Sequence, residues 1–407
     1  MAQHIRAKRL SPVELVQAHL DRIERLNPKI NAYVHVDAER ALDSARAAEV
    51  AVMHNDDLGP LHGVPISIKS SISVTGMPYE AGTKLRAGAV GETDAPLVSR
   101  LRNAGAIVLG VTNTPELLMA WETDNLLYGR TNNPWDLSRT AGGSSGGEAA
   151  AIASGCSAGG VGSDGGGSIR VPAHFCGICG LKPTPGRIPA TGHFPQSVGP
   201  FALLGVVGPM ARTVSDLKLL FEVMQGPETG DPAAAPVPVR WPYRNELKKT
   251  RIGYFEDDGR TPVTGETRAA VQRAASVLRD TGFEVEPFRP EGLEKARQLW
   301  WHFFGVAGGM LLGPLVHGRE SDLSPILREF NQWVAAESPH TGHTLLNTWI
   351  ERDLVRMQIA SIPVSLSADG LPIGIQIAAQ PWQEESVLSI AEVVEAGIGF
   401  KLQPTFS

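Results

Sequence analysis

The chain has few of the features that mark secreted, membrane-spanning or nucleic-acid-binding proteins. Its 407 residues include three cysteines, an odd number in a long chain, which argues against a disulfide framework. The 43 acidic residues outnumber the 37 basic ones, so a net charge of -6 gives no basic field for nucleic acid phosphates. The sequence also lacks an apolar leader after Met1 and any uninterrupted run of about 18 apolar residues. We therefore expect a cytoplasmic protein with no integral membrane segment and no nucleic acid partner.

Two of the cysteines, Cys176 and Cys179, have the C-x-x-C spacing of zinc and redox sites. No second cysteine pair accompanies them, and Cys156 stands apart, so the spacing is weak evidence for either kind of site. We expect buried small thiols, and a chain that works without a metal ion or cofactor.

The composition is that of a globular protein: 42% of the residues are hydrophobic and 20% are charged. Capping signals and helical spacing of apolar residues predict helices at residues 11–26, 37–54, 94–103 and 265–280. Short apolar or alternating runs predict strands at residues 64–69, 106–111, 251–255 and 283–286, and a final hairpin that turns at Asp369-Gly370. We expect one domain over residues 1–407, with a catalytic core at about 60–215. Its fold class is α/β, a single large mixed β-sheet covered by α-helices on both faces.

Residues 141–170 form a block rich in glycine and serine that partly matches several generic motifs. Gly160, Gly162 and Gly165 have the spacing of a dinucleotide fingerprint, but no helix opens there, and no acidic residue follows roughly 20 positions on. A P-loop is excluded because the block has no Gly-Lys-Ser or Gly-Lys-Thr. Gly142 to Gly146 fit G-x-S-x-G, yet the residues before them predict a turn, whereas a nucleophile elbow follows a strand.

Ser168 is the strongest candidate for a nucleophile in this block. It follows Gly165, Gly166 and Gly167, and without Cβ atoms three successive backbone N–H groups can point to one place as an oxyanion hole. The next residues predict a helical turn, which places Ser168 near a positive dipole end. Ser144 likewise precedes a helix predicted from Gly146 to Ser154, so both serine sites are helix starts.

Lys69 is the candidate base, because no histidine lies in the block and a serine hydroxyl needs a base at neutral pH. A lysine accepts a proton only when it is neutral, which burial in an apolar pocket achieves by lowering its pKa. The neighbouring Ile66 and Ile68 are apolar. His174 and His193 are the candidates for an ordinary serine–histidine arrangement, which we consider the weaker alternative.

The order and spacing of these blocks resemble the amidase signature family. The likeness rests on Lys69 in the segment Gly63-Val-Pro-Ile-Ser-Ile-Lys69, on the Gly-Gly-Ser-Ser-Gly-Gly block around Ser144, and on residues 162–170 and 175–184. It implies that Ser168 attacks the carbonyl, and that Ser144, after a cis peptide bond, relays the proton to Lys69.

The resemblance also implies roles for residues around this triad. Oxyanion donors are expected from Gly165, Gly166, Gly167 and Ser168. Asp164 and Arg170 are expected to form a supporting ion pair, and Ser145 to hydrogen-bond behind the reacting groups.

Two features depart from the family pattern. Gly165 stands where relatives usually carry a side chain. The family usually has a strand and a proline-rich segment of a few dozen residues before the final hairpin, whereas here Met357 leads almost directly into Ile359. We therefore expect a missing or deleted segment near residues 357–359, away from the catalytic blocks.

The resemblance implies a hydrolase that cleaves carboxamide bonds in a small-molecule substrate, with anilides, carbamates and esters left open. An amidotransferase subunit that delivers ammonia to a partner and a catalytically inactive scaffold are the alternatives, and a homodimer is one assembly open to the chain. Met77, Tyr79 and Trp121 are candidates for substrate contact because their segments lie near the expected site. The apolar stretch from Trp300 to Leu312 is expected in the core or, where it is exposed, in an acyl pocket or against a membrane.

Overall fold

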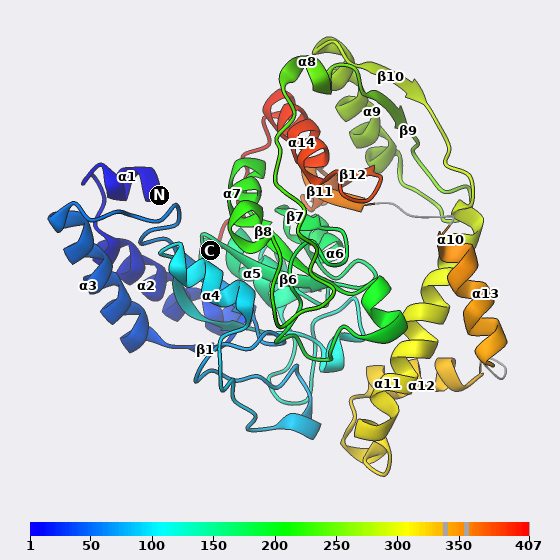
Figure 1. Cartoon of the computed structure of the whole chain (residues 1–407), viewed down its shortest axis with the longest axis horizontal. Helices are drawn as coiled ribbons and strands as arrows, with labels where there is room; N and C mark the ends of the chain where they lie inside the picture. Colours follow the sequence, from blue (N-terminus) through cyan, green and yellow to red (C-terminus); the bar gives the residue numbers. More distant parts are fainter. Residues whose placement is uncertain (337–340, 354–357, 407) are drawn as a thin grey trace.

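The structure is a computed structural model that describes residues 1–336, 341–353 and 358–406. Its centre is an eight-stranded sheet (Figure 1) with the strand order β1-β3-β2-β6-β8-β7-β11-β12. β2 is parallel to both β3 and β6, and the other neighbouring strands are antiparallel, so the predicted large mixed sheet is confirmed. The strands are β1 (Tyr33–Val36), β2 (Pro65–Lys69), β3 (Ile107–Thr112), β6 (Gly159–Asp164), β7 (Cys179–Lys182), β8 (Val206–Ala211), β11 (Gln358–Leu366) and β12 (Pro372–Ala379).

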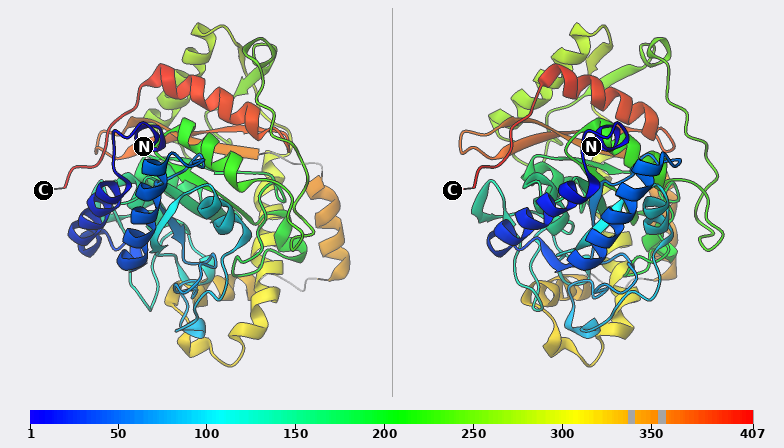
Figure 2. Two further views of the ribbon diagram at one scale, coloured as in Figure 1. Left: turned by 60° about the vertical axis from the view of Figure 1, so that its left-hand side comes forward. Right: turned by 90° about the vertical axis from the view of Figure 1, so that its left-hand side faces the viewer.

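Helices cover both faces of the sheet, and each face has its own hydrophobic cluster. In β3, Val108 joins one cluster and Leu109 the other, because successive side chains of a strand point to opposite faces. The first cluster includes α4 (Pro96–Asn103), α7 (Val214–Met224), α9 (Gly265–Asp280) and α14 (Glu384–Ile398). The second includes α2 (Pro12–Ile30), α3 (Ala38–His54), α5 (Gly146–Ala153) and α6 (Arg170–Cys176). Figure 2 shows α14, in red, lying along the orange β11–β12 hairpin.

The strand–helix–strand unit predicted beyond residue 250 forms, but its strands do not join the central sheet. β9 (Arg251–Tyr254) and β10 (Glu284–Pro287) pair in parallel as a separate two-stranded sheet. Their charged residues Arg251, Glu284 and Glu286 remain accessible to solvent, which a strand buried on both faces does not permit. The smallest sheet pairs β4 (Asn132–Asn133) with β5 (Asp136–Thr140). Two short helices lie elsewhere along the chain: α1 (Ala2–Arg6) near the N-terminus and α8 (Arg244–Leu247) just before β9.

A group of helices, α10 to α13, stands at one side of the molecule, at the lower right in Figure 1. Its members are α10 (Leu293–Trp300), α11 (Ala307–Val316), α12 (Pro325–Ala336) and α13 (Gly342–Asp353), and a π-helical turn, Trp301–Val306, joins α10 to α11. The continuous run Leu293–Val316 is the one helix among the described residues that is long and apolar enough to cross a membrane by length and composition. Its Phe304 and Leu312 are buried in a third hydrophobic cluster, which favours a packed helix of a folded protein.

Two further sequence predictions concern particular segments. Cys156, Cys176 and Cys179 are buried free thiols, as predicted. The expected missing segment near Met357 falls on residues outside those that the structure describes.

Candidate active site

Lys69 lies at the end of β2, in the middle of the central sheet, and its side chain is fully buried. Its Nζ atom is 2.6 Å from Ser144 Oγ, 3.0 Å from Ser163 Oγ and 3.1 Å from Ser145 Oγ. Within the ranges that the structure describes, Lys69 forms no salt bridge with a carboxylate. The structure therefore surrounds this amine with hydroxyl groups.

The surroundings of Lys69 suit a neutral amine. Burial holds its pKa well below the ordinary value, although the charges of Asp164 and Glu148 act in the opposite direction. A neutral amine has two N–H donors and one lone pair, which matches the three hydroxyls around it. The Ser145 hydroxyl can donate to the Ser163 carbonyl at 3.3 Å and accept from Lys69 at the same time.

The loop that carries Ser144 is held from both sides. The Thr114 hydroxyl donates to the Ser144 carbonyl at 2.8 Å, and Thr123 Oγ1 accepts from the Gly146 N–H at 3.0 Å. The Gly143–Ser144 peptide bond is cis, as the family resemblance predicted. α5 begins at Gly146, so the paired serines directly precede a helix, again as the sequence predicted.

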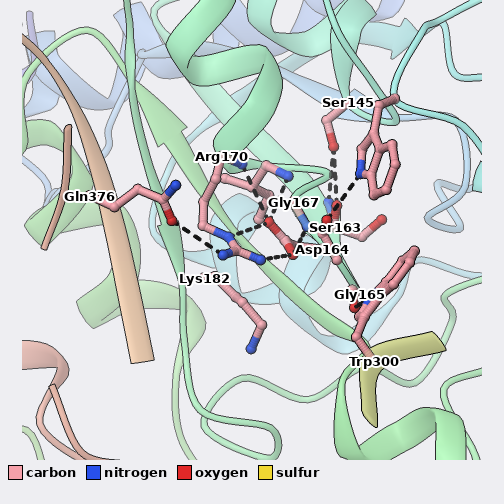
Figure 3. Close-up of polar contacts among 12 residues, drawn as sticks. Ser145, Ser163, Asp164, Gly165, Gly167, Arg170, Lys182, Trp300 and Gln376 are labelled. Atoms are coloured by element: carbon pink, nitrogen blue, oxygen red, sulfur yellow. Dashed lines mark hydrogen bonds and ion pairs between the residues drawn. The ribbon is translucent and has the colours of Figure 1, made fainter. Parts of the chain in front are cut away.

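Asp164 ends β6 and anchors the loop that carries Ser168 (Figure 3). Its carboxylate accepts from the N–H groups of Gly167 at 2.7 Å and Ile169 at 3.0 Å, and pairs with the Arg170 guanidinium at 2.9 Å. Burial alone would raise the pKa of Asp164, but the Arg170 charge and these hydrogen bonds hold it well below its usual range. The Asp164–Arg170 ion pair expected from the sequence is present.

The two serine loops lie side by side, because the Ser145 N–H donates to the Ser168 carbonyl at 3.0 Å. Ser168 itself is buried, with 5% of its surface exposed. The sequence therefore identified two serine loops that the fold places next to each other, one of which contacts Lys69.

The backbone donors before Ser168 differ in part from the prediction. The Gly167 N–H is bonded to Asp164, so it is not the free donor that the sequence suggested; its φ of +119° instead turns the chain there. Within the described residues, the N–H groups of Gly166 and Ser168 have no hydrogen-bond partner. These two groups, with Gly165, remain the candidate oxyanion donors.

Ser168 opens into a cavity of about 1220 Å³ with an aromatic wall. That wall includes Trp121, Trp300, Phe304 and Phe330, which come from two distant parts of the chain. The aromatic stretch around Trp300 is thus in contact with the cavity as well as with the third hydrophobic cluster. Charged side chains also line the cavity: Arg260, Glu294, Arg297 and Glu329.

Of the three residues predicted to contact substrate, Trp121 alone is among the described residues that line this cavity. Met77 is buried in the first hydrophobic cluster, on the sheet face covered by α4 and α7. Tyr79 packs edge-on against Phe194, and the Arg86 guanidinium lies over its ring. Neither Met77 nor Tyr79 is among the described residues that line the cavity, because closeness along the sequence to Lys69 does not place a side chain on the cavity side.

Neither candidate histidine makes a serine–histidine pair. His174 Nδ1 accepts from the Gly374 N–H of β12 at 2.9 Å, and His193 Nδ1 is 2.8 Å from the Pro195 carbonyl. Burial lowers the pKa of His193 to about 4, so this ring is neutral near neutral pH. The Nδ1 atoms of both rings contact main-chain groups, and Lys69 is the base whose amine lies within hydrogen-bonding distance of Ser144.

Sequence reasoning missed two groups near the amine. Ser163 supplies the third hydroxyl around Lys69. Glu148 accepts from the hydroxyls of Ser67 at 2.6 Å and Thr112 at 2.8 Å, and burial raises its pKa to about 7. The available signal was an acidic residue within an otherwise small and apolar helix, which predicts a buried carboxyl with polar partners.

Comparison with known proteins agrees with this arrangement. Residues 14–313 match the family model named Amidase. The indoleacetamide hydrolase of Bradyrhizobium diazoefficiens is 40% identical over 301 residues, which cover 74% of this chain and 57% of that protein's length. Human fatty-acid amide hydrolase 2 is 31% identical over 481 positions, covering 98% of this chain and 88% of the relative. That alignment is longer than the 407 residues of this chain, so the human protein carries residues that this chain lacks.

Two further matches extend the range of relatives. The A subunit of glutamyl-tRNA(Gln) amidotransferase from Carboxydothermus hydrogenoformans is 39% identical over 70% of this chain and 59% of its own length. Among solved structures, 6-aminohexanoate cyclic dimer hydrolase superposes with a TM-score of 0.85 at 26% identity, covering 99% of this chain and 97% of the other.

Proposed function

The chain belongs to the amidase family, and from this premise we propose that it hydrolyses carboxamides through an acyl-enzyme on Ser168. One observation carries the proposal: a fully buried Lys69 amine lies 2.6 Å from the Ser144 hydroxyl and has no carboxylate partner among the described residues. Burial lowers the pKa of this amine, which favours the neutral form that can accept a proton.

The proposed cycle has two halves. In acylation, Ser168 Oγ bonds to the carbonyl carbon while its proton passes to Ser144, whose own proton passes to Lys69. The C–N bond then breaks, and the same two groups return a proton to the leaving amine. In deacylation, a water molecule attacks the acyl-enzyme and gives up its proton along the same path, which releases the acid and restores the Ser168 hydroxyl.

The cavity supports substrates that carry a bulky apolar group. Its volume of about 1220 Å³ exceeds what a small aliphatic amide needs, and its wall is aromatic. Two of the relatives have names that specify an indole-bearing amide and fatty-acid amides, which are both largely apolar. We therefore propose aryl or long-chain carboxamides first, with anilides, carbamates and esters as further substrates of the same carbonyl chemistry.

A hydrolysis screen of the purified chain tests this proposal. The screen compares short aliphatic amides, arylalkyl amides, fatty amides, anilides, carbamates and esters, with Ser168→Ala as the matched inactive control. We expect turnover of at least one apolar carboxamide by the parent and none by the variant. Absence of turnover across all these classes contradicts the proposed hydrolase function.

An amidotransferase subunit is the second candidate, and the 39% identical A subunit favours it. It would use the same serines and Lys69, but it would release ammonia to a partner protein. A catalytically inactive scaffold is the remaining alternative. Hydrolysis by the isolated chain, as a monomer or homo-oligomer, excludes both, because neither a partner nor an added acceptor is then required.

A further inference from the structure

Two indole N–H groups hold the glycine loop before Ser168 by its carbonyl oxygens. Trp300 Nε1–H donates to the Gly165 carbonyl at 3.0 Å (Figure 3), and Trp121 Nε1–H donates to the Gly166 carbonyl at 3.0 Å. The two indole rings stack with their centroids 5.4 Å apart. The loop is thus fixed from the cavity side by two side chains that the proton path does not use.

Each indole also fixes the direction of one backbone N–H. Because a peptide group is planar and trans, its N–H points away from its own carbonyl. Trp300 therefore sets the direction of the Gly166 N–H, which has no other partner within the described residues. Trp121 sets the direction of the Gly167 N–H, which Asp164 already holds at 2.7 Å. The first peptide has one anchor, whereas the second has two.

The aromatic side chains fill the space that side chains on the loop would need. A Cβ atom on Gly166 would lie 2.2 Å from Trp300 Nε1, and one on Gly165 would lie 2.8 Å from Phe304 Cε2. Trp300 and Phe304 stack on each other with centroids 5.0 Å apart. Gly165, which departs from the usual family pattern, therefore leaves free the space that the Trp300–Phe304 pair occupies. A glycine peptide rotates readily, so it keeps one orientation only when it is held.

We propose that Trp300 is a positioning residue that orients the Gly166 N–H as an oxyanion donor for acyl transfer to Ser168. Trp121 supports it in a smaller part, by holding the next peptide of the loop through the Gly166 carbonyl. The inference rests on the proposed hydrolase function. Negative charge builds on the substrate carbonyl oxygen as the Ser168 Oγ–C bond forms and the C=O π bond opens. A donor that is already oriented stabilises this charge without reorganisation. Because the charge exists only in the transition state, loss of the anchor lowers kcat more than it changes KM.

Trp300→Phe and Trp121→Phe test the inference, since each keeps a ring and removes the N–H. Trp301→Phe is the matched control: Trp301 lines the same cavity, but its buried Nε1 has no hydrogen-bond partner among the described residues. We expect kcat on the best amide to fall about tenfold in Trp300→Phe and about threefold in Trp121→Phe, with a smaller loss in Trp301→Phe. KM should change by less than about threefold in the two variants that lose an anchor.

A trifluoromethyl ketone analogue of that amide gives a second measurement. Its adduct with Ser168 carries an oxyanion, so its inhibition constant should weaken about tenfold in Trp300→Phe and less in Trp301→Phe. Equal kcat values and equal inhibition constants in Trp300→Phe and Trp301→Phe overturn the inference. If Trp300→Phe does not fold, the comparison of Trp121→Phe with Trp301→Phe decides it in the same way. A parent enzyme that hydrolyses no amide refutes the proposed function instead.

Discussion

Replacement of Lys69 by methionine should remove the base and keep most of its buried volume. Nζ is the shared partner of the Ser144, Ser145 and Ser163 hydroxyls, whereas the Nδ1 atoms of His174 and His193 contact main-chain groups. No second base is therefore in place to accept the proton from Ser144.

The expected loss follows from that arrangement. A positioned general base contributes about 10²- to 10⁴-fold in rate, and the absence of a substitute base favours the upper part of this range. We expect kcat/KM of Lys69→Met to fall at least about 10³-fold, which corresponds to roughly 4 kcal/mol of transition-state stabilisation. Lys69→Arg should lose about as much, because a guanidinium does not deprotonate in proteins.

The pH dependence of the parent's kcat/KM also tests whether Lys69 is the base. Burial lowers the pKa of Lys69, and the protonated ammonium cannot accept a proton, so kcat/KM should fall as the pH drops through that depressed pKa. The residual rate of Lys69→Met should lack this acidic limb.

The assay is the initial rate of amide hydrolysis from about pH 5 to about pH 10, with the thermal unfolding midpoint measured at each pH to exclude unfolding. Two results would refute the reasoning: Lys69→Met within tenfold of the parent, or a parent profile whose acidic limb survives unchanged in the variant.

Three further substitutions have defined outcomes. Ser168→Ala should lower kcat at least about 10³-fold without a shift in unfolding midpoint, and activity within tenfold of the parent would defeat the assignment. The pKa of Glu148 is raised from 4.5 to about 7, so the native state binds more protons in this window and stability falls as pH rises. The unfolding midpoint of Glu148→Gln minus that of the parent should therefore increase from about pH 5 to about pH 8. A difference that does not change with pH would contradict this. Asp164→Asn should lower the unfolding free energy in urea by about 3 kcal/mol near neutral pH, because it leaves the partly buried Arg170 without its carboxylate partner. The depressed pKa of Asp164 means that this difference should shrink as pH falls below its ordinary value of 3.8, and a constant difference would count against the ion pair.

The local elements and the three residues that we propose to react could be selected from the sequence. β2 ends at Lys69 and α5 begins at Gly146, as alternation and helix-start signals predicted, because these patterns depend on neighbours along the chain. The family resemblance added the cis bond before Ser144 and the Asp164–Arg170 pair. The spacing of the motifs along the sequence is specific for the family, even though no single motif is.

The parts that could not be predicted depend on contacts between distant segments. Nothing near Gly165 in the sequence shows that Trp300, 135 positions later, would donate to its carbonyl. Likewise, the sequence did not show that Met77 would be buried in the first hydrophobic cluster, because the direction of a loop side chain depends on which face of the sheet the loop covers. The separate β9–β10 sheet could not be recognised from its own strands, since a short amphipathic strand can lie at the edge of the main sheet or outside it.

Covalent labelling with a fluorophosphonate, followed by peptide mass spectrometry, shows whether Ser168 is a nucleophile that Lys69 activates. We expect one phosphonyl adduct, on Ser168, whose rate of formation falls at least about 10²-fold in Lys69→Met. An adduct on another residue, no adduct on the folded parent, or equal labelling rates in parent and Lys69→Met would contradict it.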